Sequence, residues 1–288
     1  MSAQPSQPSQ SSKVVLITGT SSGIGLAAAV SAARAGWTTV ATLRDPSRSD
    51  ALRKAAAEAG VELDIRRLDV TDAASITAAV DGVLADYGHL DAVVNNAGAG
   101  HLGTLENESL ADVRKVMEVN FFGVLNVSKA AMPHLRASGG RLITVTSVGG
   151  VIGQPFNEAY CAAKFAVEGY MESLAPVAAA HGVSVCVIEP GAVATEFVAN
   201  VGVDLDEAVA DAGVYAPQLN AYLKRTVAQF FDGAQSAEGA AESVIAALTA
   251  DEPAFRLQTS DWARGFAGTK ISDLDGSAVL GMTNGWVA

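Results

Sequence analysis

A tyrosine and a lysine stand four positions apart, Tyr160 and Lys164, in the apolar stretch "YCAAKFAVEG". On a helix this spacing places both side chains on one face. A phenol titrates near pH ~10, and a neighbouring cation favours the phenolate and lowers that value. The pair could therefore exchange protons with a substrate. The structural alternative is that both side chains lay apolar stems on a core and keep their polar ends in water.

Apolar strands alternate with helices between residues 14 and 190, and these elements must position the pair. Strands are expected at 14–19, 38–43, 62–70, 90–96, 140–147 and 183–190. Helices are expected at 23–36, 50–60, 72–88, 109–137 and 157–181. The alternation predicts right-handed βαβ units, and hence an α/β fold whose parallel sheet is covered by helices on both faces.

The pattern loosens after residue 197. Helical stretches without a strand fill 198–235, a further helix is expected at 238–250, and a last strand could lie at 254–259. An irregular segment after a late strand is typical of a lid over the carboxyl edge of the sheet, where ligands bind. We place this helical substrate lid at about 196–235. A packed surface excursion would show the same pattern.

A glycine-rich turn, "TGTSSGIG" (18–25), joins the first strand to the first helix. Gly19 permits a tight turn, Gly23 lets a pyrophosphate approach the backbone, and Gly25 lets helix and strand pack closely. The same letters fit the G-x-S-x-G turn of α/β-hydrolases, but their late histidine is missing, because none follows His181. We interpret the turn as a dinucleotide site. Its further expected contacts are Ser21, Ser22 and Ile24.

The end of the second expected strand, "ATLRD", bears on the choice of dinucleotide. Leu43 stands where an acid would hold the ribose hydroxyls of NAD, and leucine cannot accept their hydrogen bonds. Arg44 follows and offers a planar fork for a 2′-phosphate. The sequence therefore favours NADP(H) over NAD(H), although a solvated arginine at a strand end is common.

Further motifs follow in order: "NNAG" (95–98), Asn120 in "VMEVNFFG", Ser147 in "TVTSVGG", the Tyr160–Lys164 pair, and "EPG" (189–191) with Thr195. In these motifs, spread over residues 13 to about 197, the chain resembles the short-chain dehydrogenase/reductase family. It is most similar to the branch of 17β-hydroxysteroid dehydrogenase type 1 and the retinol dehydrogenases. The resemblance implies a single Rossmann-type, doubly wound domain of about seven strands over 13–288.

The resemblance also implies roles. Tyr160 would protonate the carbonyl oxygen during reduction, and Ser147 would hydrogen-bond that oxygen. Lys164 would lower the pKa of the tyrosine and bind the nicotinamide ribose, while Asn120 would hold a water that connects Lys164 to solvent. The other expected cofactor contacts are Asp69, Val70, Asn95, Ala97, Gly98, Pro190, Gly191, Val193 and Thr195. The alternative for Asp69 is a plain surface position after a strand, and the alternative for Thr195 is a helix cap.

The expected reaction is NADPH-dependent reduction of a bulky, mostly apolar ketone, or oxidation of the matching secondary alcohol. Steroid specificity does not follow. The steroid enzyme of this branch holds the far end of its ligand with polar groups of its lid and tail, including a histidine, and here no histidine occurs after His181. The expected lid instead carries Tyr215, Gln218, Tyr222, Phe230 and Phe231. The alternative function is a non-catalytic dinucleotide-binding sensor on the same fold, since fold alone does not determine function. Loss of Tyr160 or Lys164 would mark a sensor, and both are present.

Composition excludes several other classes. The 288 residues include two cysteines, Cys161 and Cys186, which form neither a disulfide framework nor a metal site, so a reducing cytoplasm fits. A net charge of −12 without a basic stripe argues against nucleic acid as a partner. No apolar run is long enough for a membrane span, and residues 1–12 read as a disordered tail.

The helices at 109–137 and 157–181 predict self-association. Both carry apolar positions on more than one side, and a helix that is apolar all round requires burial on two faces. We therefore expect a homodimer or a homotetramer built on these helices. The positions on which this expectation rests are Phe165, Val167, Met171 and Leu174.

Overall fold

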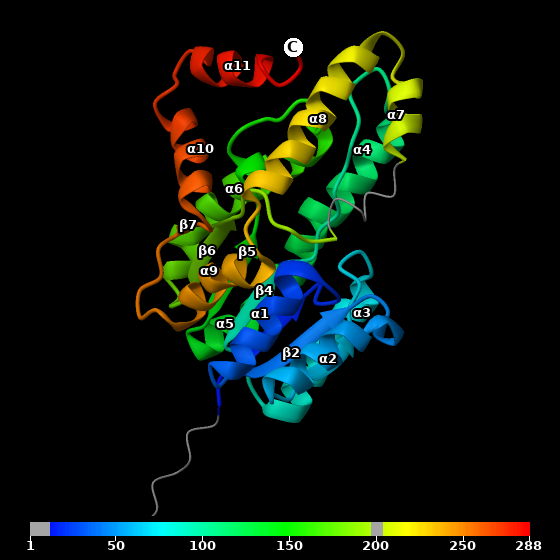
Figure 1. Cartoon of the computed structure of the whole chain (residues 1–288). Coiled ribbons are helices and arrows are strands. Elements are labelled where there is room, and N and C mark those ends of the chain that lie inside the picture. The colour runs from blue at the N-terminus through cyan, green and yellow to red at the C-terminus, as the bar shows by residue number, and fades with distance from the viewer. Residues whose placement is uncertain (1–11, 197–203) are drawn as a thin grey trace, which may run out of the picture.

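Seven parallel strands form one sheet in the computed structural model, which describes residues 12–196 and 204–288 (Figure 1). The strands are β1 (Val14–Thr18), β2 (Thr38–Leu43), β3 (Asp64–Arg67), β4 (Ala92–Asn95), β5 (Arg141–Val145), β6 (Ser184–Glu189) and β7 (Arg256–Gln258). Their order is β3-β2-β1-β4-β5-β6-β7. The chain thus starts in the middle of the sheet, winds to one edge and then crosses to the other, which confirms the doubly wound parallel sheet.

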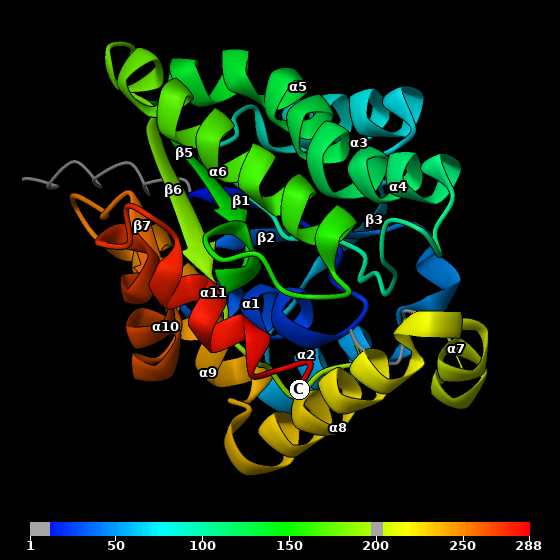
Figure 2. The same cartoon turned by 90° about the horizontal axis from the view of Figure 1, so that it is seen from above.

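Helices cover both faces of the sheet, as Figure 2 shows from above. One layer holds α1 (Gly23–Arg34), α2 (Asp50–Ala59) and α9 (Ala237–Thr249). The other holds α3 (Ala73–Tyr87), α4 (Leu110–Met117), α5 (Gly123–Ser138) and α6 (Glu158–Ala179). A separate apolar core fills each interface, with Ala28 and Val244 in the first and Val127 and Met171 in the second. Burial on both faces explains why the strands are continuous apolar runs.

The helix expected at 109–137 is interrupted. A π-helical turn, Glu118–Phe122, separates α4 from α5. Asn120 lies within this turn with no exposed surface, and its Nδ2 donates to the carbonyl oxygens of Ala99 (2.9 Å) and Val116 (3.1 Å). Such wide turns occur frequently at functional sites, and this one directs an amide toward the loop that follows β4.

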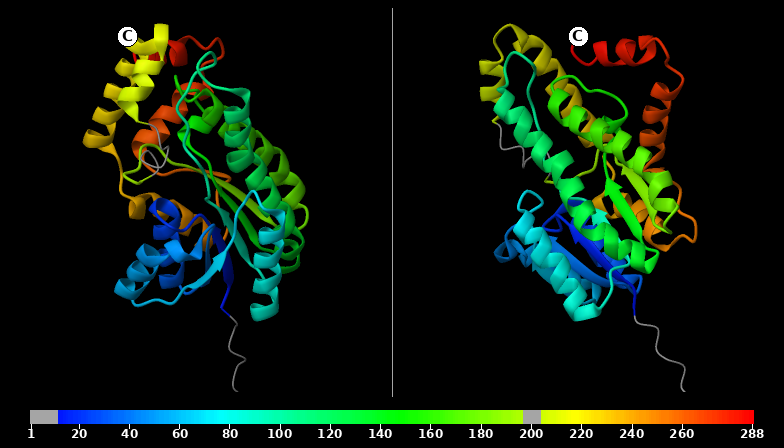
Figure 3. Two further views of the ribbon diagram at one scale, coloured as in Figure 1. Left: turned by 90° about the vertical axis from the view of Figure 1, so that its right-hand side faces the viewer. Right: turned by 180° about the vertical axis from the view of Figure 1, so that it is seen from behind.

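Four helices extend beyond the carboxyl ends of the strands (Figures 1 and 3). They are α7 (Leu205–Asp211), α8 (Ala216–Gly233), α10 (Asp261–Ile271) and α11 (Ser277–Asn284). The sequence pattern did not predict α10 and α11. Phe266 and Trp286 from this end of the chain pack with Leu219 and Tyr222 of α8 in a third apolar cluster. Across the described parts of the chain, no helix is both long enough and apolar enough to cross a bilayer.

Part of two sequence predictions lies outside the described residues. The expected lid at 196–235 includes residues 197–203, and the expected tail at 1–12 includes residues 1–11. The side chains of Phe230 and Phe231 are likewise outside the described part. Ser12 is described, and its hydroxyl hydrogen-bonds the hydroxyl of Thr38 at the start of β2.

Candidate active site

A cavity of about 900 Å³ lies at the carboxyl ends of the strands, where open α/β sheets bind ligands. Residues at or just beyond the ends of β1 to β6 line it, including Gly19, Leu43, Asn96 and Pro190. The fold brings Ser147, Tyr160 and Lys164 into the same cavity. Residues that lie 145 positions apart in the sequence, such as Gly19 and Lys164, therefore face one space.

Two glycines of the turn, Gly19 and Gly25, have no room for a side chain. Gly19 has φ +70°, and a Cβ there would lie 2.7 Å from Cα of Ala97. A Cβ on Gly25 would lie 2.2 Å from the carbonyl oxygen of Gly19. Ser22 precedes α1 and, within the described part of the chain, makes no side-chain cap to the helix. The first N–H groups of α1 thus remain available for an anion, and the turn fits a pyrophosphate.

Asn96 holds the glycine turn in place. Its Nδ2 donates to the carbonyl oxygens of Thr18 (3.0 Å) and Gly19 (2.9 Å), and Oγ1 of Thr18 accepts from the N–H of Asn96 at 3.0 Å. Asn96 also lines the cavity. We had not expected this residue as a site residue, although the "NNAG" motif contains it. The turn after β4 and the turn after β1 are therefore one hydrogen-bonded unit.

Asn95, expected as a cofactor contact, lies elsewhere. It is 2% exposed, it is not among the residues that line the cavity, and its Nδ2 donates to Oγ of Ser128 at 2.9 Å. Neighbouring residues at the end of a strand point to opposite sides, so Asn96 faces the cavity while Asn95 ties β4 to α5. The structure thus corrects the placement of Asn95. Ala97 and Gly98 do line the cavity.

The rim beside β2 and β3 is rich in guanidinium groups. Leu43 is buried, while Arg44 and Arg48 are exposed and line the cavity. Asp45 lies between them, and hydrogen bonds from the hydroxyl (2.7 Å) and N–H (3.0 Å) of Ser47 hold its pKa below the usual range. Arg48 was not expected. Asp69 and Val70 line the same part of the cavity, as the resemblance implies.

Ser147 and Tyr160 converge over Gly149. Ser147 follows β5, and Tyr160 lies in the first turn of α6. A Cβ on Gly149 would lie 3.3 Å from Oγ of Ser147 and 3.4 Å from Cε1 of Tyr160. Burial raises the pKa of Tyr160 well above its usual value, and a hydrogen bond with Ser147 opposes part of that rise. The phenol is therefore protonated at neutral pH.

Lys164 is 4% exposed, and its Nζ donates to the carbonyl oxygen of Val145 at 3.1 Å. Burial lowers the pKa of Lys164 to about 8, and the charge of Glu168 opposes this. Nζ lies 5.8 Å from the ring centroid of Tyr160. We expected Lys164 to lower the pKa of Tyr160. In the structure the pKa of the phenol shifts upward instead, because burial outweighs any attraction from an ammonium that is bonded to Val145.

Asn120 supports the site from behind. Its Oδ1 accepts from the N–H of Ala99 at 3.1 Å, so one amide binds both backbone groups of that residue. A Cβ on Gly98 would lie 2.9 Å from Oδ1 of Asn120 and 3.7 Å from Nζ of Lys164. Asn120 is not among the residues that line the cavity. The absence of a side chain at Gly98 lets the amide and the ammonium approach each other.

The segment after β6 closes the cavity from above the glycine turn. The carbonyl oxygen of Pro190 accepts from the N–H of Val148 at 2.9 Å. A Cβ on Gly23 would lie 3.1 Å from Cγ2 of Thr195, so Thr195 lies against the turn. Val193 forms an isolated bridge with Gln235. The expected contacts after β6 therefore all line the cavity, namely Pro190, Gly191, Val193 and Thr195.

An aromatic wall that the sequence pattern did not predict completes the cavity. The rings of Trp262 and Phe266 stack with centroids 4.9 Å apart, and those of Phe266 and Trp286 with centroids 5.9 Å apart. The guanidinium of Arg225 lies 3.8 Å from the ring centroid of Trp286. All four residues line the cavity. Trp262 and Phe266 are four residues apart, and this spacing in the sequence would have indicated that the two rings share one face of a helix.

Known proteins match this chain closely. The sequence signature described as short chain dehydrogenase matches residues 13–206. Estradiol 17-beta-dehydrogenase 1 of Rattus norvegicus is 38% identical over 276 residues, which cover 93% of this chain and 80% of the relative. Retinol dehydrogenase 8 of Bos taurus is 35% identical over 273 residues, 92% of this chain and 87% of the relative.

Solved structures agree with the sequence relatives. The alcohol dehydrogenase of Thermococcus sibiricus complexed with 5-hydroxy-NADP superposes with a TM-score of 0.70 and 28% identity, over 85% of this chain and 95% of that one. The parallel sheet, the glycine turn and the convergent Ser147, Tyr160 and Lys164 agree with these matches. The chain therefore belongs to the short-chain dehydrogenase/reductase family of NAD(P)-dependent oxidoreductases.

Proposed function

We propose that this enzyme uses NADPH to reduce a bulky, mostly apolar ketone, and that it oxidises the matching secondary alcohol in reverse. The observation that carries the proposal is the meeting of Ser147, Tyr160 and Lys164 with the glycine turn in one cavity. Arg44 and Arg48 line that cavity near the glycine turn, and Trp262, Phe266 and Trp286 give it an aromatic part. These two parts suit a dinucleotide and an apolar substrate, respectively.

The glycine turn and the uncapped start of α1 would hold the pyrophosphate of the cofactor. Asp69 and Val70 would lie against the adenine, and Gly98, Val193 and Thr195 would surround the nicotinamide. The ammonium of Lys164 would bind the hydroxyls of the nicotinamide ribose. A reduced nicotinamide, when bound, supplies the hydride that a carbonyl carbon accepts.

Preference for NADPH is supported by the rim beside β2. Leu43 offers no acceptor to a ribose hydroxyl, and Arg44 and Arg48 offer two planar guanidinium groups to a 2′-phosphate. Asp45 is the one acid between them, and its carboxylate already accepts two hydrogen bonds from Ser47. Its remaining capacity to bind ribose hydroxyls is therefore reduced, whereas both arginines remain exposed.

Tyr160 would act as the general acid in reduction. A pKa raised by burial keeps the phenol protonated at neutral pH, which is the form that donates a proton to a carbonyl oxygen. Ser147 would donate a hydrogen bond to the same oxygen and stabilise its developing charge. Alcohol oxidation needs the phenolate instead, so the ratio of oxidation to reduction should rise with pH. Asn120 would position a water that returns protons through Lys164.

The reacting end of the substrate would lie between the catalytic residues and the aromatic wall of Trp262, Phe266 and Trp286. We place α7 and α8 as the lid over this space, and residues 13–288 as one oxidoreductase domain. A relative named estradiol dehydrogenase and another named retinol dehydrogenase support a bulky, apolar substrate. Polycyclic and polyene ketones, aldehydes and alcohols are the classes to test.

The enzyme would work as a homodimer or homotetramer. Val167 and Met171, two of the positions that suggested this, face the core with 1% and 0% exposure, so they do not meet a partner. Phe165, a third of those positions, is 37% exposed and stays in the proposal. Further apolar side chains on the same layer of helices are exposed and join it, namely Phe122, Tyr170 and Val177.

Oxidation of NADPH, followed by its absorbance against a panel of ketones and aldehydes, tests the proposed function. The panel should contain tetracyclic ketones, retinal and small aliphatic ketones, each with NADH as the alternative reductant. We expect turnover of the bulky carbonyls, with NADPH preferred. Turnover restricted to small polar carbonyls, or no turnover with either cofactor, would contradict the proposal.

A further inference from the structure

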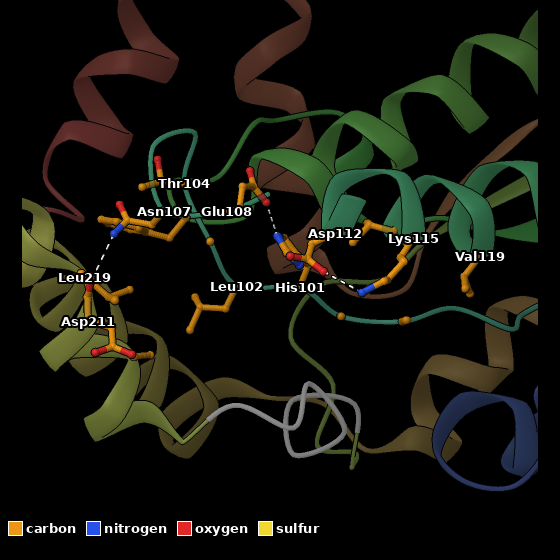
Figure 4. Close-up of a pocket in the computed structure, with 17 residues that line it drawn as sticks. His101, Leu102, Thr104, Asn107, Glu108, Asp112, Lys115, Val119, Asp211 and Leu219 are labelled. Carbon is orange, nitrogen blue, oxygen red and sulfur yellow. Dashed lines mark hydrogen bonds and ion pairs between the residues drawn. The ribbon is translucent and has the colours of Figure 1, made fainter. Parts of the chain in front are cut away.

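A second cavity of about 500 Å³ adjoins the catalytic one (Figure 4). It lies between the loop after β4 on one side and helices α7 and α8 on the other, which contribute Asp211 and Leu219. The two cavities share five lining residues: Ala99, Gly100, His101, Leu102 and Val119. The loop after β4 and Val119 of the π-helical turn therefore form the boundary between them, and a long ligand could contact both cavities.

A buried histidine–carboxylate pair stands at this boundary. The side chains of His101 and Glu108 are 14% and 8% exposed, and Nε2 lies 2.5 Å from Oε2. Figure 4 shows the imidazole turned toward the carboxylate. His101 lines both cavities, whereas Glu108 lines the second only. Because Nε2 is bonded to Glu108, Nδ1 is the atom that can meet a ligand, and no described residue hydrogen-bonds it.

The loop does not need this pair to keep its shape. Asn120 already binds both backbone groups of Ala99 at the start of the loop. The N–H of Gly103 donates to the carbonyl oxygen of Phe156 at 2.9 Å, and Oγ1 of Thr104 donates to Oε1 of Glu158 at 2.9 Å. Burying an ionisable pair is costly and often adds no net stability. A role in binding explains why such a pair occurs here.

The second cavity has an apolar interior and an acidic rim. Its apolar lining residues are Ala99, Leu102, Val116, Val119, Phe156, Ala208, Ala212 and Leu219. Three carboxylates line it, Glu108, Asp112 and Asp211, against the single ammonium of Lys115, which pairs with Asp112 at 2.9 Å. An anionic ligand would be repelled, and an uncharged apolar ligand with one polar group would not.

We propose that this second cavity receives the end of the substrate that lies far from the reacting carbonyl, and that His101 hydrogen-bonds an uncharged hydroxyl there. The substrate class is then an extended apolar ketone with a distal hydroxyl. The proposal rests on the proposed function for its reacting end. Glu108 acts as a positioning residue, because its carboxylate fixes the imidazole with Nδ1 turned away from it.

Three tetracyclic ketones of one skeleton test this subsite: one with a hydroxyl on the ring farthest from the carbonyl, one with hydrogen there, and one with a carboxylate. We expect the wild-type enzyme to favour the hydroxyl ketone in kcat/KM and to discriminate against the carboxylate. His101→Leu should lose roughly 10- to 100-fold in kcat/KM on the hydroxyl ketone, the range for a hydrogen bond that a charged partner strengthens. Its kcat/KM on the hydrogen analogue should stay within about twofold.

His89→Leu is the matched control. His89 also pairs with a carboxylate, Asp91, with Nε2 and Oδ2 3.2 Å apart, but it precedes the central strand β4, at the amino ends of the strands, and lines neither cavity. His89→Leu should leave kcat/KM unchanged on all three ketones. His101→Gln, which keeps a polar side chain, should recover part of the preference for the hydroxyl ketone. Equal losses by His101→Leu on the hydroxyl ketone and its hydrogen analogue would mean a structural role and overturn the proposal.

Equilibrium binding separates this inference from the proposed chemistry. Calorimetry with the Tyr160→Phe protein measures the Kd of the hydroxyl ketone and of the hydrogen analogue without turnover. Adding His101→Leu should weaken only the hydroxyl ketone, by the same 10- to 100-fold factor. If the wild-type enzyme turns over no ketone but the hydroxyl ketone still binds as expected, only the proposed function is contradicted. Unchanged binding of the hydroxyl ketone would overturn the subsite alone.

Discussion

The carboxylate of Glu168 lies 3.1 Å from the guanidinium of Arg256, on the helix face that also carries Tyr160 and Lys164. The three residues of α6 are spaced four apart, so Glu168 continues the same face one turn beyond Lys164. The other oxygen of Glu168 accepts from the hydroxyl of Thr146, which precedes Ser147. Arg256 of β7 also lies 2.6 Å from buried Glu189. Two buried carboxylates and a half-buried guanidinium thus form a charged network next to the catalytic residues.

Glu168→Gln should shift the pH dependence of catalysis. The charge of Glu168 raises the pKa of Lys164, which burial lowers to about 8. Without that charge the pKa of Lys164 falls further, and the ammonium loses its proton at a lower pH. Since the proposed mechanism needs the ammonium, activity should decline at a lower pH than in the wild type. A pH profile of kcat/KM measures this.

Glu172→Gln is the control for that experiment, because Glu172 meets the same Arg256 at 3.2 Å but its side chain is 66% exposed. Its profile should match the wild type. A profile of Glu168→Gln that superposes on the wild type would show that the carboxylate does not support Lys164.

Arg256→Gln should destabilise the fold, and more so at high pH. Burial raises the pKa values of Glu168 and Glu189, and Arg256 opposes both shifts. Removing one partner of a buried ion pair costs about 3 kcal/mol. In the variant, the native carboxyls hold more protons than the unfolded ones, so the free energy of unfolding should fall as pH rises through their raised pKa values. Urea unfolding at acidic and at neutral pH measures both effects.

Arg264→Gln is the matched control for Arg256→Gln. Arg264 pairs with Asp261 at 3.3 Å, but the two side chains are 70% and 97% exposed. Exposed pairs contribute less than about 1 kcal/mol, so this variant should unfold nearly like the wild type. If Arg256→Gln changed the free energy of unfolding as little as Arg264→Gln does at every pH, the network would carry no buried charge.

Tyr160→Phe should lower kcat by ~10²–10⁴-fold, the usual contribution of a general acid. It removes the proton donor and little else, so the Kd for NADPH should stay within about twofold. Tyr222→Phe is the control, because Tyr222 lines the same cavity and its hydroxyl accepts from Asn157 at 2.7 Å. Steady-state kinetics with a bulky ketone should show only a small loss there. If Tyr160→Phe kept more than about a tenth of the activity, another group would be the acid.

Arg44→Ala should weaken NADPH binding by roughly 10- to 150-fold, because a hydrogen bond to a charged group contributes ~1.5–3 kcal/mol. NADH lacks the 2′-phosphate, so its binding should hardly change. Arg48→Ala should show a smaller loss of the same kind. The double variant Leu43→Asp with Arg44→Ala should invert the preference, because a carboxylate binds ribose hydroxyls and repels phosphate. A wild-type kcat/KM higher with NADH than with NADPH would refute the cofactor assignment and leave Tyr160 unaffected.

Val177→Glu should weaken self-association. Val177 lies on α6 and is 62% exposed, and a charge placed inside an apolar interface is costly. Light scattering of the wild type should give a multiple of 29.3 kDa, and the variant a lower mass. Val214→Glu, 82% exposed on the turn before α8, is the control and should not change the mass. A wild-type monomer at micromolar concentration would defeat the proposed assembly.

Local spacing was enough to predict much of this protein. The alternation of strand and helix defines the sheet, because side-chain periodicity and turn residues are read within a few positions. The glycine turn, and Tyr160 with Lys164 one helical turn apart, are local in the same sense. The order of the strands then follows from connections that are short and right-handed.

Only the tertiary structure decided which residues meet across distant elements. It turned Asn96 toward the cavity and Asn95 away from it, and it brought Arg48 to the rim. It also placed Trp286 and the rest of the aromatic wall over the site, and paired His101 with Glu108 at the boundary of the second cavity. Sequence spacing does not determine contacts between distant elements, because they depend on how packed layers meet.

The pKa of Tyr160 shows the same division most clearly. From the sequence, a lowered pKa is expected for Tyr160, because the cation of Lys164 lies on the same helix face. Burial by the surrounding layers raises the pKa instead, and the ammonium binds Val145 of another strand. Charge spacing can be read from the sequence, whereas desolvation depends on everything that packs around the group. The sequence therefore determined which groups could do the chemistry, and the tertiary structure determined their protonation and their partners.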